Sequence, residues 1–177
     1  MNDGFYAPLG GREGKAAAMA QMPWHVALGR GNAAWDAVDR NDPLWQDALL
    51  PDAAQARGLV SEIGRRIADE VAFVLRDDAN GEIVLPDSRW ARCPDGVVSN
   101  HLYIQAFLDY PDGANETVRE LGLFAGGRAV NGLPPGQRWL PPGDVAAPGH
   151  LMRLVRYAVP VKRSPSNRPL FHFVETF

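Results

Sequence analysis

A regular alternation of apolar residues along residues 102–110 restricts the fold more than any other feature of this chain. Every second residue of this run is apolar, and the set comprises Leu102, Ile104, Ala106, Leu108 and Tyr110. A period of two is typical of a β-strand with one buried face, because successive side chains of a strand point to opposite faces. Asp112-Gly113 supplies a turn signal, and a second strand is predicted over residues 116–124. The sequence therefore predicts an antiparallel hairpin.

The same period appears along residues 67–76, where the apolar positions are Ile67, Val71, Phe73 and Leu75. Asn80-Gly81 follows this run and readily adopts the positive φ angles of a tight turn, and an apolar stretch comes directly after it. We expect a second hairpin between the strand over 67–76 and residues 82–85. Residues 59–68 are expected to lead into its first strand.

Three further strands are predicted at residues 24–28, 151–161 and 169–177. In the last of them, Phe171, Phe173 and Phe177 share one face, since they are separated by even numbers of residues. An edge strand of this kind can be completed by a strand of a neighbouring chain. We therefore expect these three phenylalanines to belong to an interface.

Residues 125–150 carry five prolines and six glycines, which excludes a helix and disfavours a central strand. A loop of this length is usually functional or bound to a partner. We expect residues 128–149 to be ordered by a partner or by a neighbouring copy of the chain. The interface residues predicted in this loop are Pro134, Pro135, Trp139, Pro141 and Pro142.

The length of 177 residues suits one domain, and 18 glycines with 15 prolines favour a turn-rich β protein over a helix bundle. We predict a mainly β fold: an antiparallel β-sandwich-like domain with short helices and long Pro/Gly-rich loops. Residues 1–23 are expected to form an N-terminal arm, with a short helix near residues 15–22. Residues 24–177 form the single β-rich domain, which includes the extended loop 125–150.

Charge and cysteine content disfavour several classes of protein. The net charge of −3 gives no basic excess for binding nucleic acid, and the single cysteine, Cys93, excludes a disulfide within the chain. No apolar run approaches the ~20 residues of a membrane-spanning helix, and the first residues do not resemble a signal peptide. We expect no membrane insertion, no nucleic-acid partner, and synthesis in a cytoplasm.

No pattern of residues predicts a catalytic, metal or cofactor site. Gly11 to Lys15 resembles half of a phosphate loop, but Leu9 and Ala16 stand where glycine and serine or threonine are needed. Asp78 to Gly81 resembles the middle of a calcium loop, but a hairpin turn explains it better. The four histidines lack the close spacing of metal ligands. We therefore expect neither a cofactor nor enzymatic activity.

Three segments resemble a known class of proteins. VRELGLFAGG at residues 118–127 is similar to a strand signature of bacteriophage tail-fibre, tail-collar and baseplate-associated proteins. WHVALGRGNAAWD at residues 24–36 looks like a segment near the start of such proteins, and RYAVPVKRS with FHFVETF looks like the closing strands of collar-type domains. The likeness covers 24–36, 60–127 and 151–177. The loop at 128–149 departs from it, since typical collar domains have a short turn there.

The resemblance implies a structural component of a bacteriophage tail, as a baseplate protein, tail-fibre adaptor or collar protein that docks neighbouring virion subunits. The implied partners are other tail or baseplate proteins and copies of the chain itself. The implied location is the virion tail, after assembly in the cytoplasm of the host bacterium.

Two other readings stay open at this point. A carbohydrate- or ligand-binding β-sandwich module would stack sugars on some of the tryptophans, which are Trp24, Trp35, Trp45, Trp90 and Trp139. An enzyme would need a site assembled in space, for example a metal site that includes His101.

Overall fold

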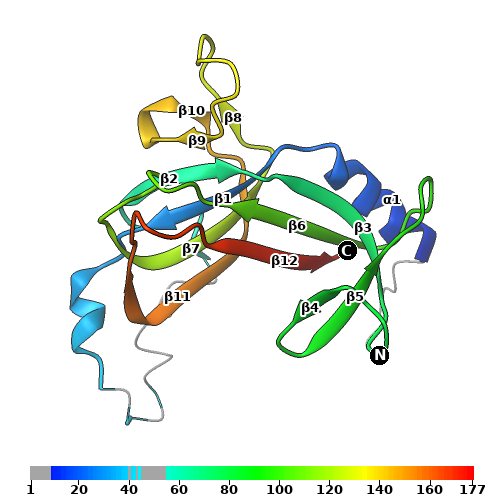
Figure 1. The fold of residues 1–177 in the computed structure, drawn as a ribbon, viewed down its shortest axis with the longest axis horizontal. Helices are drawn as coiled ribbons and strands as arrows, with labels where there is room; N and C mark the ends of the chain where they lie inside the picture. Colours follow the sequence, from blue (N-terminus) through cyan, green and yellow to red (C-terminus); the bar gives the residue numbers. More distant parts are fainter. Residues whose placement is uncertain (1–8, 40, 43, 45–54) are drawn as a thin grey trace, which may run out of the picture. The chain divides into compact units, whose positions relative to one another are not determined.

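The computed structural model describes residues 9–39, 41–42, 44 and 55–177. The chain is mainly β, with 45% strand and 13% helix, which confirms the predicted antiparallel β fold (Figure 1). It divides into two compact units. The small unit holds the chain up to Met22, Asp69–Gln105 and His172–Phe177, and the large unit holds Pro23–Ala68 and Ala106–Phe171. Whether the chain behaves as an arm plus one domain stays a prediction.

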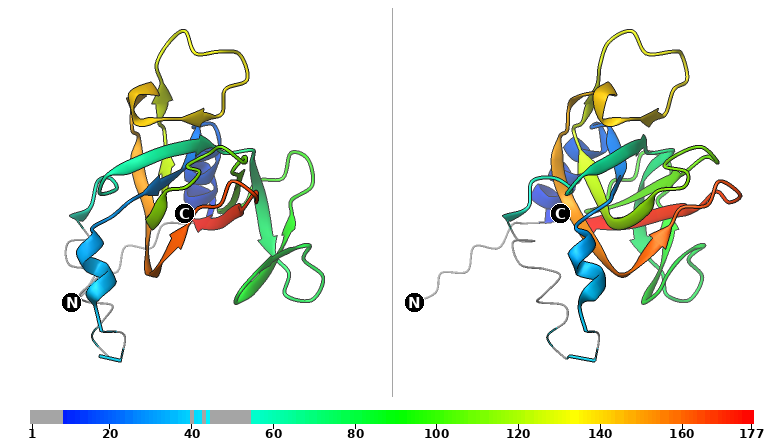
Figure 2. Two further views of the ribbon diagram at one scale, coloured as in Figure 1. Left: turned by 60° about the vertical axis from the view of Figure 1, so that its left-hand side comes forward. Right: turned by 90° about the vertical axis from the view of Figure 1, so that its left-hand side faces the viewer.

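The large unit is built on a five-stranded antiparallel sheet in the order β11-β7-β1-β2-β9. Its strands are β1 (Trp24–Gly29), β2 (Glu62–Ile67), β7 (Thr117–Ala125), β9 (Trp139–Leu140) and β11 (His150–Lys162). Every residue of the central strand β1 is buried, because β7 and β2 flank it on either edge and the sheet curls like half a barrel (Figure 2). The strand predicted at 24–28 is confirmed.

The small unit holds most of the second sheet, in the order β12-β6-β3-β5-β4. The strands are β3 (Glu70–Arg76), β4 (Ile83–Leu85), β5 (Ser88–Arg92), β6 (His101–Phe107) and β12 (Leu170–Thr176). A helix, α1 (Leu9–Ala20), belongs to the same unit and begins earlier than the helix predicted near 15–22. The unit has an apolar core made of Val74, Ile83, Trp90 and Tyr103.

The predicted hairpin between 102–110 and 116–124 is wrong in its pairing, although both strands exist. β6 pairs with β3, whereas β7 pairs with β1 and β11 in the other sheet. The turn itself is formed: the amide of Asp112 donates to the carbonyl of Asp109 (3.1 Å), and Gly113 has φ +61°. Alternation fixes the buried face of a strand but not its partner, which depends on contacts distant in sequence.

The predicted pairing of 67–76 with 82–85 is also wrong. The first stretch is split into β2 and β3 by Ala68 and Asp69, and β3 pairs with β5 instead of β4. β4 forms its own hairpin with β5. The Asn80-Gly81 segment folds back onto β5, since the Gly81 amide donates to Asp77 and a Cβ at Gly81 would lie 2.5 Å from the Trp90 nitrogen. This loop separates β3 from β4.

The Pro/Gly-rich segment 125–150 contains short pieces of regular structure. They are β8 (Arg128–Ala129), β9, the 3-10 helix η3 (Pro142–Asp144) and β10 (Val145–Ala147), and β10 pairs with β8. β9 sits at the edge of the large sheet, as expected for a stretch next to prolines. Another 3-10 helix, η1 (Ala33–Ala37), lies in the region expected to hold short helical pieces.

Candidate docking surfaces

The side chains of metal-binding type do not gather in one place in the described part of the chain. Within those residues there is no group of three or more His, Cys, Asp or Glu side chains able to hold a metal ion. His101, which an assembled site would need, has its Nδ1 2.9 Å from the Thr176 hydroxyl and its ring 4.9 Å from the Trp90 ring. Burial lowers the pKa of His101, with a smaller contribution from Arg12. No helix among the described residues is long and apolar enough to cross a membrane.

The first candidate surface is residues 130–149, which we call the proline arm. Its base is anchored to β2: the Ile67 amide donates to the Arg138 carbonyl (3.0 Å), and Trp139 pairs with Arg66 in the ladder. The Trp139 ring lies against Gly64, where a Cβ would come within 2.5 Å of it. Leu140 is fully buried. The arm is therefore held at its base by its own unit.

The outer part of the proline arm is exposed. Pro134 and Pro135 lie in the loop between β8 and β9, and Pro141 and Pro142 follow β9 (Figure 2). All four prolines are exposed, whereas Trp139 is half-buried. Proline has few conformations to lose on binding, which suits a docking loop. The idea that a partner orders this exposed part stays a prediction.

The three phenylalanines predicted at the interface lie in different environments. Phe171 belongs to the large unit and lines a pocket there. Phe173 is buried in the small unit. Phe177 is half-buried in the same unit, with its amide donating to the Asn100 carbonyl (2.9 Å) and the Lys15 ammonium 5.6 Å from its ring. Their role at an interface stays a prediction.

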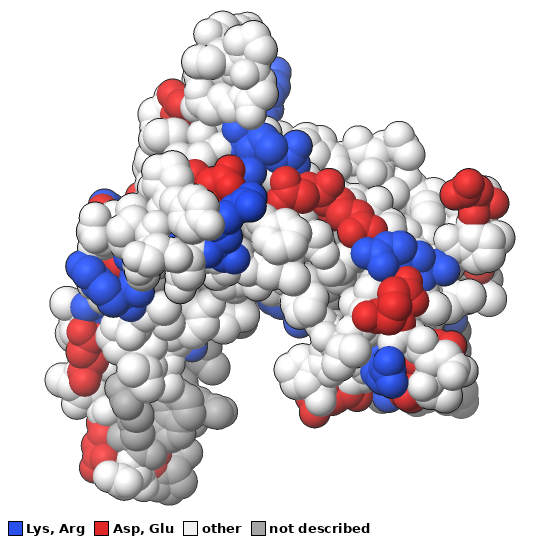
Figure 3. All heavy atoms as spheres, viewed as in Figure 1, with Lys and Arg blue, Asp and Glu red and all other residues white. Residues whose placement is uncertain are grey.

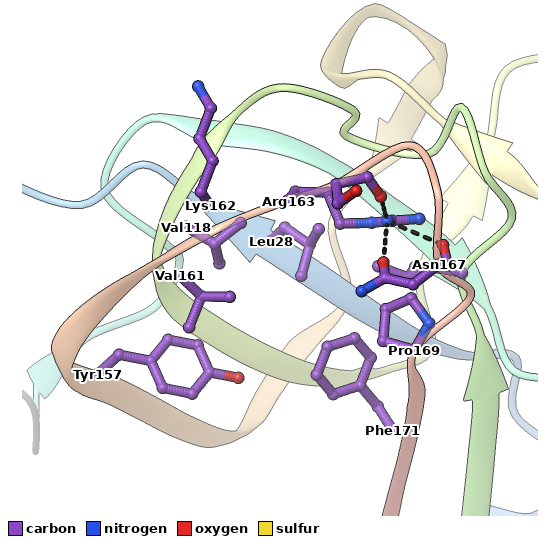
Figure 4. A pocket seen from close by; sticks show the side chains of 11 residues that line it. Leu28, Val118, Tyr157, Val161, Lys162, Arg163, Asn167, Pro169 and Phe171 are labelled. Carbon is purple, nitrogen blue, oxygen red and sulfur yellow. Dashed lines mark hydrogen bonds between the residues drawn. The ribbon is translucent and has the colours of Figure 1, made fainter.

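The second candidate surface is a pocket of about 190 Å³ in the large unit, which we call the β11 pocket. Figure 4 shows Leu28 of β1 and Val118 of β7 behind it, Tyr157 and Val161 of β11 on one side, and Phe171 on the other. The remaining lining residues are Leu108, Lys162, Arg163, Ser164, Asn167 and Pro169. The sequence did not predict this pocket, because its walls come from four separate segments.

Arg163 brings a positive charge to the wall of the β11 pocket. Its side chain donates to the carbonyls of Ser164, Asn167 and Asp109 and to the Asn167 amide oxygen, all of them neutral acceptors. The residue is only 4% exposed, and its buried Nε has no hydrogen-bond partner within the described part of the chain. Burial lowers the pKa of Arg163, and the more distant Asp112 opposes this shift.

Tyr157 contributes a free polar group to the same pocket. Its hydroxyl points into the pocket in Figure 4 and makes no hydrogen bond to any residue that the structure describes. Burial raises the pKa of this phenol, so it remains a hydrogen-bond donor at neutral pH. The pocket therefore combines apolar walls with a hydroxyl donor and a buried cation.

Strand β11 is an edge strand, and it is irregular where it borders the pocket. Arg156 pairs with Glu120 and Val161 pairs with Val118, so residues 157–160 bulge out of the ladder. Val159 and Val161 are 56% and 49% exposed. Bulges and a proline such as Pro160 commonly protect an edge against uncontrolled pairing. The bulge here also places Tyr157 in the pocket wall.

Buried ion pairs that join distant parts of the sequence hold the large unit together. Arg66 donates to the carboxylates of Asp109 and Asp112 (2.9 Å each), which fixes the turn after β6. Glu120 is fully buried and pairs with Arg156 at 2.9 Å. The partners of Arg66 lie more than 40 residues away along the chain, whereas Arg65 pairs with Glu62, three residues away.

The described tryptophans lie in different environments, each within its own unit. Trp24 and Trp90 are buried in the large and small unit respectively. The Trp35 ring is covered by the Arg156 guanidinium at 4.6 Å, and Trp139 packs on Gly64. Trp45 lies outside the described residues.

The surface charges are mixed in sign. On the face shown in Figure 3, Lys and Arg side chains lie beside Asp and Glu side chains. Exposed pairs include Arg30 with Glu116, and Arg92 with Glu70 and Glu82.

A comparison with known protein families shows which family the chain belongs to. Residues 7–177 match the family described as "Baseplate wedge 3 tail fiber network component", so the chain belongs to this family. No curated protein matches the chain. The chain is therefore a structural component of a phage baseplate, located in the virion tail, which confirms the resemblance noted from the sequence.

Proposed function

We propose that this baseplate component docks neighbouring tail proteins through its proline arm and thereby links the wedge to the tail-fibre network. The observation that carries the proposal is the contrast within the arm. Trp139 and Leu140 anchor the base, while Pro134, Pro135, Pro141 and Pro142 stand exposed. A loop fixed at its base and restricted by proline presents a preformed surface, which lowers the entropic cost of docking.

We also propose what kind of role the chain has, where it is assembled and which neighbours it contacts. The role is structural and without catalysis, which the membership of a baseplate family supports. Assembly takes place in the host cytoplasm, and copies of the chain are candidate neighbours beside other tail proteins.

The test replaces Asn131–Gly136, the outer part of the arm, with two glycines. Phage lacking the gene are complemented with the variant, and the chain is quantified in purified virions by mass spectrometry. We expect the variant to fold and its incorporation to fall at least tenfold. The control shortens Pro94–Gly96, an exposed turn of the small unit, and should incorporate normally. Normal incorporation of the arm variant would contradict the proposal.

A further inference from the structure

We infer that the β11 pocket binds an aromatic side chain from an extended, acidic segment of a neighbouring tail protein. The inference rests on the proposed docking function and adds a site and the chemistry of the partner to it. It uses a surface separate in sequence from the exposed part of the proline arm.

The size and walls of the pocket fit one aromatic ring. Its volume is about 190 Å³, and a buried cavity of about 150 Å³ lined by aliphatic and aromatic side chains is large enough for benzene. Leu28 and Val118 supply apolar surface at the back of the pocket, and Phe171 supplies it at one side (Figure 4). A phenylalanine or tyrosine ring that enters it loses water contact on both faces, which favours binding.

The charge of the pocket wall selects an acidic segment. Arg163 is buried with only neutral oxygen partners, and its Nε is unpaired among the described residues. The charge of Asp112 acts on Arg163, but that carboxylate is hydrogen-bonded to Arg66 and not to Arg163, so an incoming carboxylate is favoured beside Arg163. Lys162 adds a second positive charge at the rim, and the free Tyr157 hydroxyl adds a donor. The partner's Asp or Glu would lie next to its aromatic residue.

The approach to the pocket is open and apolar. Val159, Val161 and Leu170 are all exposed beside it, although large apolar side chains are usually better covered. Within the described chain, no strand pairs with the outer edge of β11. An extended segment can therefore approach along this edge, beside residues 153–156, which keep a regular ladder with β7 on the other edge. The bulge at 157–160 ends this pairing and directs the ring into the pocket.

The first experiment fills the pocket. Val161 lines it and is half exposed, so Val161→Trp places an indole in or over the opening. Val159→Trp is the matched control, because Val159 is about as exposed and lies two residues away on the same strand but does not line the pocket. In the complementation assay we expect virion incorporation of Val161→Trp to fall at least fivefold, with Val159→Trp near wild type. Circular dichroism and thermal unfolding of both variants establish that they fold alike.

The second experiment uses the wild-type chain in assembled baseplates. Its sequence contains two lysines, Lys15 in α1 and Lys162 at the rim of the pocket. A carbodiimide joins lysine amines directly to carboxylates, so it reports a carboxylate in contact with the rim. We expect Lys162 to be joined to an Asp or Glu next to an aromatic residue of another tail protein. Lys15 serves as the internal control and should not be joined to that segment.

The outcomes separate this inference from the proposed function. If Val161→Trp incorporates normally while the arm variant is lost, the inference is overturned and the docking function stands. If neither variant affects incorporation, both fail. A Lys162 link to a second copy of this chain, or to a segment without an aromatic residue, would also overturn the inference. The inference is supported if Val161→Trp fails to incorporate while Val159→Trp incorporates normally, and if Lys162 forms the expected link.

Discussion

The two units of this protein are stabilised in different ways. In the small unit the core is apolar, and its arginine pairs lie at the surface, where Arg92 binds Glu70 and Glu82. In the large unit charged side chains are buried within the sheet and its turns. These are Arg65, Arg66, Asp112, Glu120 and Arg163, and no charged side chain of the described small unit is buried to the same degree.

The difference indicates what fixes each structure. Apolar packing tolerates exchanges of similar volume, whereas a buried charge requires one particular partner. The buried pairs of the large unit therefore specify how β2, β7, β11 and the turn after β6 come together. We expect removal of one charged partner to be costly in the large unit and nearly neutral in the small one.

The largest effect is expected at Glu120, whose carboxylate pairs with Arg156 and accepts from the Val60 amide at 2.6 Å. Glu120→Ala removes the carboxylate that binds the buried Arg156 guanidinium and accepts from the Val60 amide, so it should lower the free energy of unfolding by about 3–5 kcal/mol. Urea denaturation measures this. The double change Glu120→Leu with Arg156→Met removes both charges and should cost clearly less. A loss below ~1 kcal/mol for Glu120→Ala would show that the buried pair contributes no more to stability than a surface pair.

The next effect depends on pH and concerns His25 in β1. Burial, and secondarily the charge of Arg65, lowers the pKa of His25 from 6.5 to about 4. As the pH falls through this range, the unfolded chain takes up a proton that the folded chain does not. The folded state should therefore lose up to ~3 kcal/mol between pH 6.5 and 4.

Unfolding experiments at several pH values compare wild type with His25→Leu. The variant should lose less stability on acidification, because its residue 25 does not titrate. Identical pH dependence of the two proteins would show that folding does not shift the pKa of His25.

A smaller effect is expected where the backbone approaches His25 closely. A Cβ added at Gly127 would lie 2.5 Å from the His25 Nδ1, so Gly127→Ala should cost about 1–3 kcal/mol. Combining Gly127→Ala with His25→Ala should recover part of this loss of stability in a double-mutant cycle measured by thermal unfolding. Additive losses would mean that the contact with His25 is not the cause.

The smallest effect is expected in the small unit. Arg92 binds Glu70 and Glu82 at a side chain that is 40% exposed. Solvent weakens such pairs, so Arg92→Ala should cost no more than about 1 kcal/mol in urea denaturation. A cost as large as that of Glu120→Ala would remove the distinction between the units.

Local patterns in the sequence predicted the strands well but not their partners. The period of two marked β3 and β6, and turn residues marked Asn80-Gly81 and Asp112-Gly113. The assumed pairing of successive strands failed because β6 and β7 belong to different sheets. Arg66, which holds the intervening turn, is separated from Asp109 and Asp112 by more than 40 residues, and no local pattern reveals such a contact.

The two candidate docking surfaces also differ in whether the sequence predicts them. The proline arm was predictable, since proline and glycine restrict the backbone locally whatever the rest of the chain does. The β11 pocket was not, because Leu28, Val118 and Phe171 meet only after the sheet has formed. Phe171 was singled out for its place on a strand face, and the pocket gives that residue a more definite environment.

Hydroxyl-radical footprinting of the free chain and of intact virions tests most directly that the docking surfaces lie in the large unit. We expect Pro134, Pro135 and Val161 to react with hydroxyl radicals in the free chain and to be strongly protected from them in the virion. Val84, which is 57% exposed in the small unit, should keep most of its reactivity. Equal reactivity of the arm and Val161 in both samples, or protection confined to the small unit, would contradict the account.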